Sequence, residues 1–178
     1  MTFRLADSLP ESARRRIEFE RQDIVATARM MRRTLSRGEE VRLSRLSRKK
    51  IEGQLDAGAG ACWLEQSNIA EIVSQSLRCF DGTRYRLFAW CVMPNHVHVL
   101  FRPSADHSLA SIVHTWKSYS AKAANGALQR SGEFWGREYF DHIVRNDIEF
   151  GRIVRYILEN PAKAGLRNWH WAGCSLDS

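Results

Sequence analysis

The stretch YRLFAWCVMPNHVHVLF, residues 85–101, decides the fold of this 178-residue chain. Its two halves, Tyr85–Val92 and His96–Phe101, are rich in β-branched and aromatic residues, and Met93-Pro94-Asn95 separates them. This pattern predicts two antiparallel strands joined by a tight turn at the centre of a sheet. The apolar run that contains Phe88–Met93 begins at Leu87 and is far shorter than the roughly 20 residues that a membrane span requires. We therefore expect a soluble protein without a membrane partner.

Helical patterns lie on both sides of these strands. We predict a helix capped by Asn68 and ending at Asp81-Gly82, a helix over Ser108–Asn125, and a helix from Asp147 that Asn160-Pro161 stops, because proline cannot continue the backbone ladder. Thr2–Leu5 is predicted as a short first strand and His142–Val144 as a last edge strand.

The positive charge of the chain is concentrated at one end. The formal net charge is +7, and the first 50 residues hold 14 Lys/Arg against 7 Asp/Glu, whereas the remainder is balanced. We predict one helix from Glu11 to about Arg37 and a second with Leu43, Leu46, Ile51 and Leu55.

Two basic clusters in this region are candidate phosphate contacts. The first consists of Arg14, Arg15 and Arg16, and the second of Arg48, Lys49 and Lys50. Clusters of this kind can bind the phosphates of a nucleic acid without reading its bases. Solvated helix faces are the alternative.

The candidate chemistry begins with His96 and His98. Side chains alternate along a strand, so both imidazoles lie on one face of the sheet and Val97 lies on the other. Two imidazoles on one face can hold a divalent ion if a third ligand comes from elsewhere. A pair of half-buried or surface histidines is the alternative.

Tyr156 and Asn160 are four residues apart on the last helix and therefore share one of its faces. An amide oxygen of Asn160 could complete the metal site, and the phenol of Tyr156 could reach the same place. A metal, a phenol and a basic surface together suggest phosphodiester chemistry. The alternative is a core tyrosine followed by a helix cap.

Other reactive side chains have simpler interpretations. The four cysteines are far apart without a C-x-x-C pair, so we expect reduced thiols in a cytoplasmic protein. Association with the nucleoid is a separate expectation, which depends on DNA being the partner. Tyr119 is a weaker candidate nucleophile, because no amide follows it one turn later. We leave His142 out of the site, and we expect Trp116, Trp135 and Trp169 to serve packing more than base stacking.

Two segments carry a resemblance to a known family, MPNHVH at residues 93–98 and RYILENPAKAGL at residues 155–166. The chain resembles the REP-associated tyrosine transposases, an IS200-like branch of the single-tyrosine HUH transposases. The middle segments WKSY, GEFW and DHIVRN, at residues 116–119, 132–135 and 141–146, are also similar in order and spacing. The resemblance spans about residues 66–168. It implies an α+β fold in which helices flank a ferredoxin-like antiparallel sheet.

The resemblance implies a role for each matched residue. His96, His98 and Asn160 would bind the metal, Mg²⁺ or Mn²⁺, although two imidazoles alone suit Zn²⁺ better. Tyr156 would attack single-stranded or hairpin DNA and form a 5′-phosphotyrosine during transposition or REP-element processing. Lys117, in one of the middle segments, is a further candidate DNA contact.

The chain departs from this family at its beginning. Only Thr2–Leu5 precedes a basic helical insertion over residues 10–60, ahead of a catalytic core at 61–168 within one domain of 1–178. If the first strand is incomplete, a sheet edge is exposed, so we expect a monomer or a homodimer. Two rival functions are a non-catalytic module for single-stranded nucleic acid and a metal-dependent nuclease without a covalent intermediate.

Overall fold

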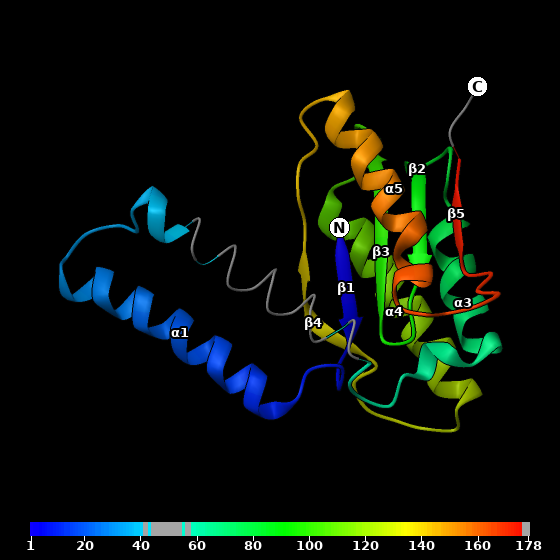
Figure 1. Ribbon diagram of the computed structural model, residues 1–178, viewed down its shortest axis with the longest axis horizontal. Helices are drawn as coiled ribbons and strands as arrows, with labels where there is room; N and C mark the ends of the chain where they lie inside the picture. Colours follow the sequence, from blue (N-terminus) through cyan, green and yellow to red (C-terminus); the bar gives the residue numbers. More distant parts are fainter. Residues whose placement is uncertain (41–42, 44–54, 56–57, 176–178) are drawn as a thin grey trace. The chain divides into compact units, whose positions relative to one another are not determined.

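A computed structural model describes residues 1–40, 43, 55 and 58–175 (Figure 1). The chain divides into two compact units, one formed by Met1–Ala6 with Cys62–Ser178 and the other by Asp7–Ala61. The helices and strands of the first unit are β1 (Thr2–Leu5), a 3₁₀ turn (Trp63–Glu65), α3 (Ser67–Arg78), β2 (Tyr85–Val92), β3 (His96–Pro103), α4 (Leu109–Ala127), β4 (Trp135–Phe140), α5 (Asp147–Lys163) and β5 (Ala172–Cys174).

The five strands form one antiparallel sheet in the order β4-β1-β3-β2-β5. The β2–β3 hairpin is its centre, as predicted, and pairs Cys91 with His98. The first four strands with α3 and α4 follow the β-α-β-β-α-β succession of a ferredoxin-like fold. The predicted α+β class, with helices flanking an antiparallel sheet, is therefore confirmed.

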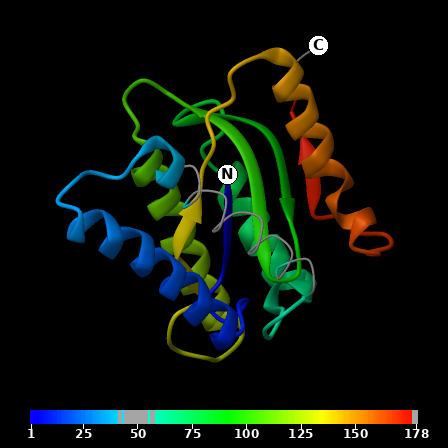
Figure 2. The ribbon, with the colours of Figure 1, turned by 60° about the vertical axis from the view of Figure 1, so that its left-hand side comes forward.

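The two faces of the sheet carry different helices, as Figures 1 and 2 show for α5 on one side and α3 and α4 on the other. Val97 and Val99 of β3 join the large core against α3 and α4, in which Trp116 donates to the hydroxyl of Tyr85. A smaller core holds α5 against the other face, and its buried residues are Ala89, Cys91, Met93, Leu100, Val154 and Ile157. The strand alternation places His96 and His98 on this α5 face.

Both edges of the sheet differ from the prediction. Residues 141–146 form no strand, and β4 at Trp135–Phe140 is one edge while β5 is the other. The short β1 is an interior strand, because it pairs with β3 on one side and β4 on the other. The condition for an exposed edge at this strand is thus not met, because its four residues pair with a neighbour on both sides.

Two helix ends also differ. The N-cap of α3 is Gln66, without a side-chain cap, so Asn68 lies within the first turn and does not cap the helix. Pro161 lies inside α5, which continues to Lys163. The helix tolerates Pro161 because it falls in the last turn, where the amide of Ala164 still donates to Asn160 and that of Leu166 to Pro161.

The second unit contains α1 (Glu11–Met30), which ends seven residues before the predicted Arg37. Its chain reverses at Arg32, whose φ of 50° lies in the left-handed region and stops the helix. Most of the second predicted helix, with Leu46 and Ile51, lies outside the described residues. No helix among the described residues is long and apolar enough to cross a bilayer.

Candidate active site

The histidine pair lies inside the sheet on the α5 face. His96 and His98 are 1% and 3% exposed, because β1 and β2 flank β3 on both sides and α5 covers it. The Nε2 atoms of the two rings are 2.9 Å apart. The alternative of surface histidines is therefore excluded, and the two ring nitrogens converge on one point.

The other nitrogen of each ring has its own partner. His96 Nδ1 lies 2.7 Å from Oδ1 of the buried Asn95, and His98 Nδ1 lies 2.8 Å from Oγ1 of Thr2 on β1. Burial lowers the pKa of His96 to about 3, so this imidazole is neutral at physiological pH. A neutral imidazole fixed at its second nitrogen is the form that binds metals.

Helix α5 brings Tyr156 to the pair. The rings of Tyr156 and His98 make an edge contact with centroids 5.4 Å apart. Phe150, nearer the start of α5, stacks edge-on against Phe88 of β2. The helix thus runs antiparallel to β3 (Figure 1), and Asn160, one turn beyond Tyr156, lies toward the His96 end of the strand.

The side chain of Asn160 is buried, and one end of its amide has no hydrogen-bond partner. It is 4% exposed, and its Nδ2 has no hydrogen-bond partner. An unpaired buried amide costs roughly 1–3 kcal/mol, so an ion at this position would relieve the cost. The nitrogen and oxygen of the amide exchange by a half-turn, and the unpaired end can therefore present its oxygen.

These residues fit a divalent metal. Two imidazole nitrogens bound at right angles, each about 2.1 Å from an ion, would be about 3.0 Å apart, close to the 2.9 Å between the two Nε2 atoms. Within the described residues no group of three His, Cys, Asp or Glu side chains could hold a metal. A third protein ligand would accordingly be an amide, and the buried Asn160, one helical turn beyond Tyr156, is the candidate.

Lys117 has backbone partners in the structure. Its Nζ donates to the carbonyl oxygens of Gly136 and Arg137 at 2.6 and 3.1 Å. Burial, with a smaller effect of Arg4, lowers the pKa of the Lys117 amine. The observed contacts therefore tie α4 to β4, and a DNA contact of Lys117 stays a prediction.

The structure describes the two basic clusters of the N-terminal region to different extents. Arg15 and Arg16 are exposed on α1, and Arg14 belongs to the same helix. Arg48, Lys49 and Lys50 lie outside the described residues. A phosphate-binding role for Arg48, Lys49 and Lys50 thus stays a prediction from the sequence.

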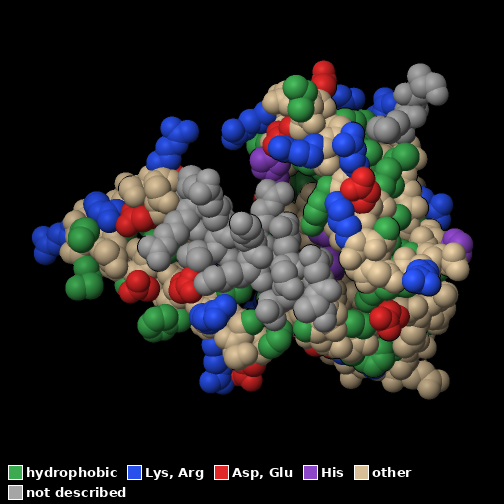
Figure 3. All heavy atoms as spheres, viewed as in Figure 1, with side chains coloured by type: hydrophobic (Ala, Val, Ile, Leu, Met, Phe, Trp, Pro, Cys, Tyr) green, Lys and Arg blue, Asp and Glu red, His purple; other side chains and the backbone are tan. Residues whose placement is uncertain are grey.

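Helix α5 adds basic side chains that the sequence reasoning did not single out. Arg152, Arg155 and Lys163 are exposed on this helix, and Figure 3 shows Lys and Arg side chains in blue over it. Arg152 and Lys163 pair with Glu149 and Glu159 of the same helix. Ion pairs this exposed contribute little to stability, so both cations are accessible to other anions.

The alternative nucleophile lies on the other side of the sheet, and His142 and the tryptophans have contacts of their own. Tyr119 is 60% exposed on α4, on the opposite side of the sheet from α5. His142 binds Glu149 through Nε2 at 2.8 Å. Trp116 and Trp135 are buried in the core, as their packing role predicts, and Trp169 donates to the carbonyl of Val92.

Sequence reasoning missed the β1 side of the site. Thr2 and Arg4 are the register partners of His98 and His96, and Arg4 is a buried cation. Their alternation with Phe3 and Leu5, both core residues, places them on the α5 face. This alternation is visible in the sequence, but the pairing of β1 with β3 across more than 90 residues is not.

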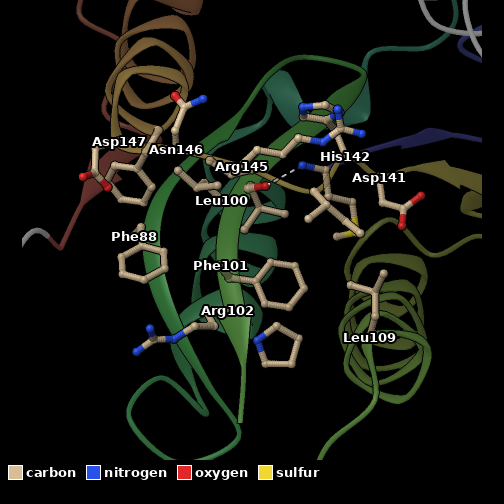
Figure 4. A pocket seen from close by; sticks show the side chains of 16 residues that line it. Phe88, Leu100, Phe101, Arg102, Leu109, Asp141, His142, Arg145, Asn146 and Asp147 are labelled. Atoms are coloured by element: carbon tan, nitrogen blue, oxygen red, sulfur yellow. Dashed lines mark hydrogen bonds between the residues drawn. The ribbon is translucent and has the colours of Figure 1, made fainter. Parts of the chain in front are cut away.

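A pocket of about 580 Å³ lies between the later residues of β3, the start of α5 and Leu109 of α4 (Figure 4). It is lined by strand residues including Phe88, Leu100 and Arg102, and by Arg145 and Phe150 around the start of α5. The guanidinium groups of Arg86 and Arg102 lie 5.6 and 6.0 Å from the centre of the Phe88 ring. The pocket therefore combines aromatic rings with cations, and its lining does not include His96, His98 or Tyr156.

Comparison with known proteins gives the family of this chain. The chain belongs to the IS200-like transposase family, whose model matches residues 65–160, more than half of its length. It is 26% identical over 82 residues to a REP-associated tyrosine transposase of Escherichia coli. A Haemophilus influenzae protein that carries the same class name is 23% identical over 107 residues.

These alignments cover 46% and 52% of this chain, and 47% and 61% of the two relatives. The chain thus spans about half to three fifths of the length of the curated relatives that it matches. A solved structure of a REP-associated tyrosine transposase bound to a REP hairpin aligns with a TM-score of 0.47 at 23% identity. That alignment covers 61% of this chain and 64% of the other.

Proposed function

We propose that this protein cleaves and rejoins single-stranded or hairpin DNA in transposition or REP-element processing, with Tyr156 as the nucleophile. The observation that carries the proposal is the contact between Tyr156 and His98, one member of a buried histidine pair that fits a metal. Membership of the IS200-like transposase family supports DNA as the substrate. The protein would act in the cytoplasm, at the nucleoid, as a monomer or homodimer.

The reaction conserves the phosphodiester bond energy. The Tyr156 oxygen would attack the scissile phosphorus, the phenol proton would pass to solvent, and the P–O3′ bond would break to release a free 3′ hydroxyl. The 5′ phosphate would then remain on the tyrosine until another 3′ hydroxyl attacks it and displaces the phenolate, which regains a proton. Cleavage and joining thus share one covalent intermediate.

His96, His98 and Asn160 would hold Mg²⁺ or Mn²⁺, which when bound supplies charge stabilisation at the phosphate oxygens. The tyrosine needs this help, because a phenol with an ordinary pKa near 10 is mostly protonated at neutral pH. The protein would keep both imidazoles buried and His96 neutral, and α5 would present the phenol next to them.

Denaturing electrophoresis of labelled DNA with the protein and Mn²⁺ tests the proposal. A covalent protein–DNA band supports it. Binding without cleavage would favour the non-catalytic binding module, and metal-dependent cleavage without an adduct would favour the nuclease in which Tyr156 only orients water. Either result would refute the tyrosine mechanism.

The pocket near the start of α5 offers a path for the DNA strand beyond Tyr156. Phe150 precedes Tyr156 by six residues, or about 9 Å along α5. A strand whose phosphate lies at Tyr156 would therefore bring a neighbouring nucleotide over Phe88 and Arg102. Stacking on an aromatic ring contributes roughly 1–3 kcal/mol per base.

We expect Arg102→Gln with Arg145→Gln to weaken binding of oligonucleotides that extend past the cleavage position by about tenfold, and to leave shorter ones unaffected. The measurement is fluorescence anisotropy over a series of DNA lengths. Arg137→Gln, on the exposed surface of β4, is the matched control. Equal length dependence in the double variant and the wild type would show that the strand takes another path.

The basic N-terminal region is proposed to contact phosphates without reading bases. Arg15 is paired with Glu11, but an ion pair this exposed contributes little and leaves the guanidinium accessible. We expect neutralising Arg14–Arg16, or the second cluster of Arg48, Lys49 and Lys50, to weaken binding to every sequence alike. The slope of log affinity against log salt should fall by roughly 0.7 per lost contact.

Salt titrations of each triple glutamine variant against several hairpin sequences measure this slope. Catalysis at saturating DNA should be retained, because these substitutions change neither the proposed metal ligands nor the proposed nucleophile. A wild-type slope would identify the clusters as solvated faces, and a loss confined to one hairpin would indicate base or shape readout instead.

A further inference from the structure

We propose that Thr2 is a positioning residue for the metal site, whose hydroxyl supports both tautomers of His98 and so lets the histidine pair give up its internal hydrogen bond for a metal ion. This inference rests on the metal binding stated under the proposed function. It assigns a role to β1, which contributes no residue to the ligand set.

The hydrogen bonds of the structure define one arrangement of protons. The Oδ1 atom of Asn95 can only accept, so His96 carries its proton on Nδ1 and its Nε2 has a free lone pair. The 2.9 Å contact between the two Nε2 atoms needs one proton, which must then be on Nε2 of His98. With that nitrogen protonated, neutral His98 accepts at Nδ1, and Thr2 donates its hydroxyl hydrogen.

Metal binding requires the second arrangement. Both Nε2 atoms must then present lone pairs, so the proton of His98 has to be on Nδ1. The hydroxyl of Thr2 can accept a hydrogen bond from that N–H after rotating about its C–O bond, because a hydroxyl is both donor and acceptor. The heavy atoms that the structure shows, 2.8 Å apart, therefore serve both states without backbone movement.

The two histidines differ in this respect. Asn95 fixes His96 in the metal-binding tautomer at all times, whereas Thr2 allows His98 to change. Thr2 is held for this task because its Cα pairs with His98 on β3 and with Phe140 on β4. An acceptor-only side chain at Thr2 would favour one tautomer, and an apolar one would leave a buried N–H unpaired.

Thr2→Val tests the proposal, because valine keeps the branched shape and strand preference but removes the hydroxyl. We expect Mn²⁺ affinity, measured by electron paramagnetic resonance without DNA, to fall by roughly 10–100-fold. Thr2→Ser, which keeps the hydroxyl, should bind Mn²⁺ within about threefold of the wild type. Thermal melts of all three proteins check that the fold is retained.

Nitrogen NMR of the histidine rings reports their tautomers directly. A purely structural role of Thr2 would not predict a change of the His98 tautomer on metal binding. In the wild type, His98 should change from the Nε2–H to the Nδ1–H form when the diamagnetic Zn²⁺ is added, and His96 should remain Nδ1–H. Unchanged Mn²⁺ affinity in Thr2→Val, or a His98 tautomer that is the same with and without Zn²⁺, overturns the role of Thr2 alone. A wild-type protein that binds no Mn²⁺ refutes the metal assignment itself.

Discussion

Tyr156→Phe is expected to abolish the covalent protein–DNA adduct and to lower strand cleavage by at least about 10³-fold. The substitution removes the attacking oxygen and nothing else, and a mechanism that depends on one nucleophile loses nearly all of its rate with it. The ring of phenylalanine can keep the edge contact with His98, whose centroid is 5.4 Å from that of Tyr156. The fold and DNA affinity should therefore be close to those of the wild type.

Tyr119→Phe is the matched control, because it removes a phenol of the same intrinsic reactivity from an exposed position on α4. This variant should form the adduct at the wild-type rate. Peptide mapping of the wild-type adduct should place the DNA on the α5 peptide that contains Tyr156. An adduct that persists in Tyr156→Phe and disappears in Tyr119→Phe would exchange the roles of the two tyrosines.

The part of the site that the sequence predicted depends on local periodicity. The alternation of His96-Val97-His98 defines one face of a strand, and the four-residue spacing of Tyr156 and Asn160 defines one face of a helix. Neither spacing states that the two faces meet. The resemblance to a family supplied that expectation, and the ring contact between His98 and Tyr156 agrees with it.

The part that could not be predicted comes from long-range pairing. Thr2 binds His98 across 96 residues, and no local pattern records such a register. β5 contains only Ala172, Gly173 and Cys174, a composition without β preference, and forms because the edge of β2 accepts it. Glycine suits position 173 because a Cβ atom there would lie only 3.2 Å from ring atoms of Trp90.

The rule that proline ends a helix predicted the end of α5 too early, because the helix continues through Pro161 to Lys163. A proline removes one hydrogen bond within a helix, but near the C-terminus the helix loses little by it. Because α5 continues to Lys163, Asn160 lies inside the helix and is not its C-cap. Its side chain is also buried, whereas a residue that caps a helix end is usually exposed. The observed boundary thus favours the ligand interpretation of Asn160 over the cap.

Removal of either histidine is expected to abolish metal-dependent cleavage. His96→Ala or His98→Ala leaves one imidazole for the metal, and the charge stabilisation lost at the phosphate should lower cleavage by at least about 10³-fold. Hairpin binding should be largely unchanged, because the proposed phosphate contacts of the basic clusters and the pocket do not include these side chains. Mn²⁺ binding and strand cleavage are measured on the same samples.

Since His96 is buried, its alanine variant could lose stability as well as the metal, and His98→Leu, which keeps most of the side-chain volume but offers no metal-binding atom, gives a second test. Asn160→Ala should weaken Mn²⁺ binding less than either histidine variant, because an amide oxygen is the weaker ligand. It should not unfold the protein, since its Nδ2 has no partner to lose. Full cleavage by folded His96→Ala and His98→Leu proteins would refute the metal assignment. An unchanged Mn²⁺ titration in Asn160→Ala would limit Asn160 to a structural role in the last turn of α5.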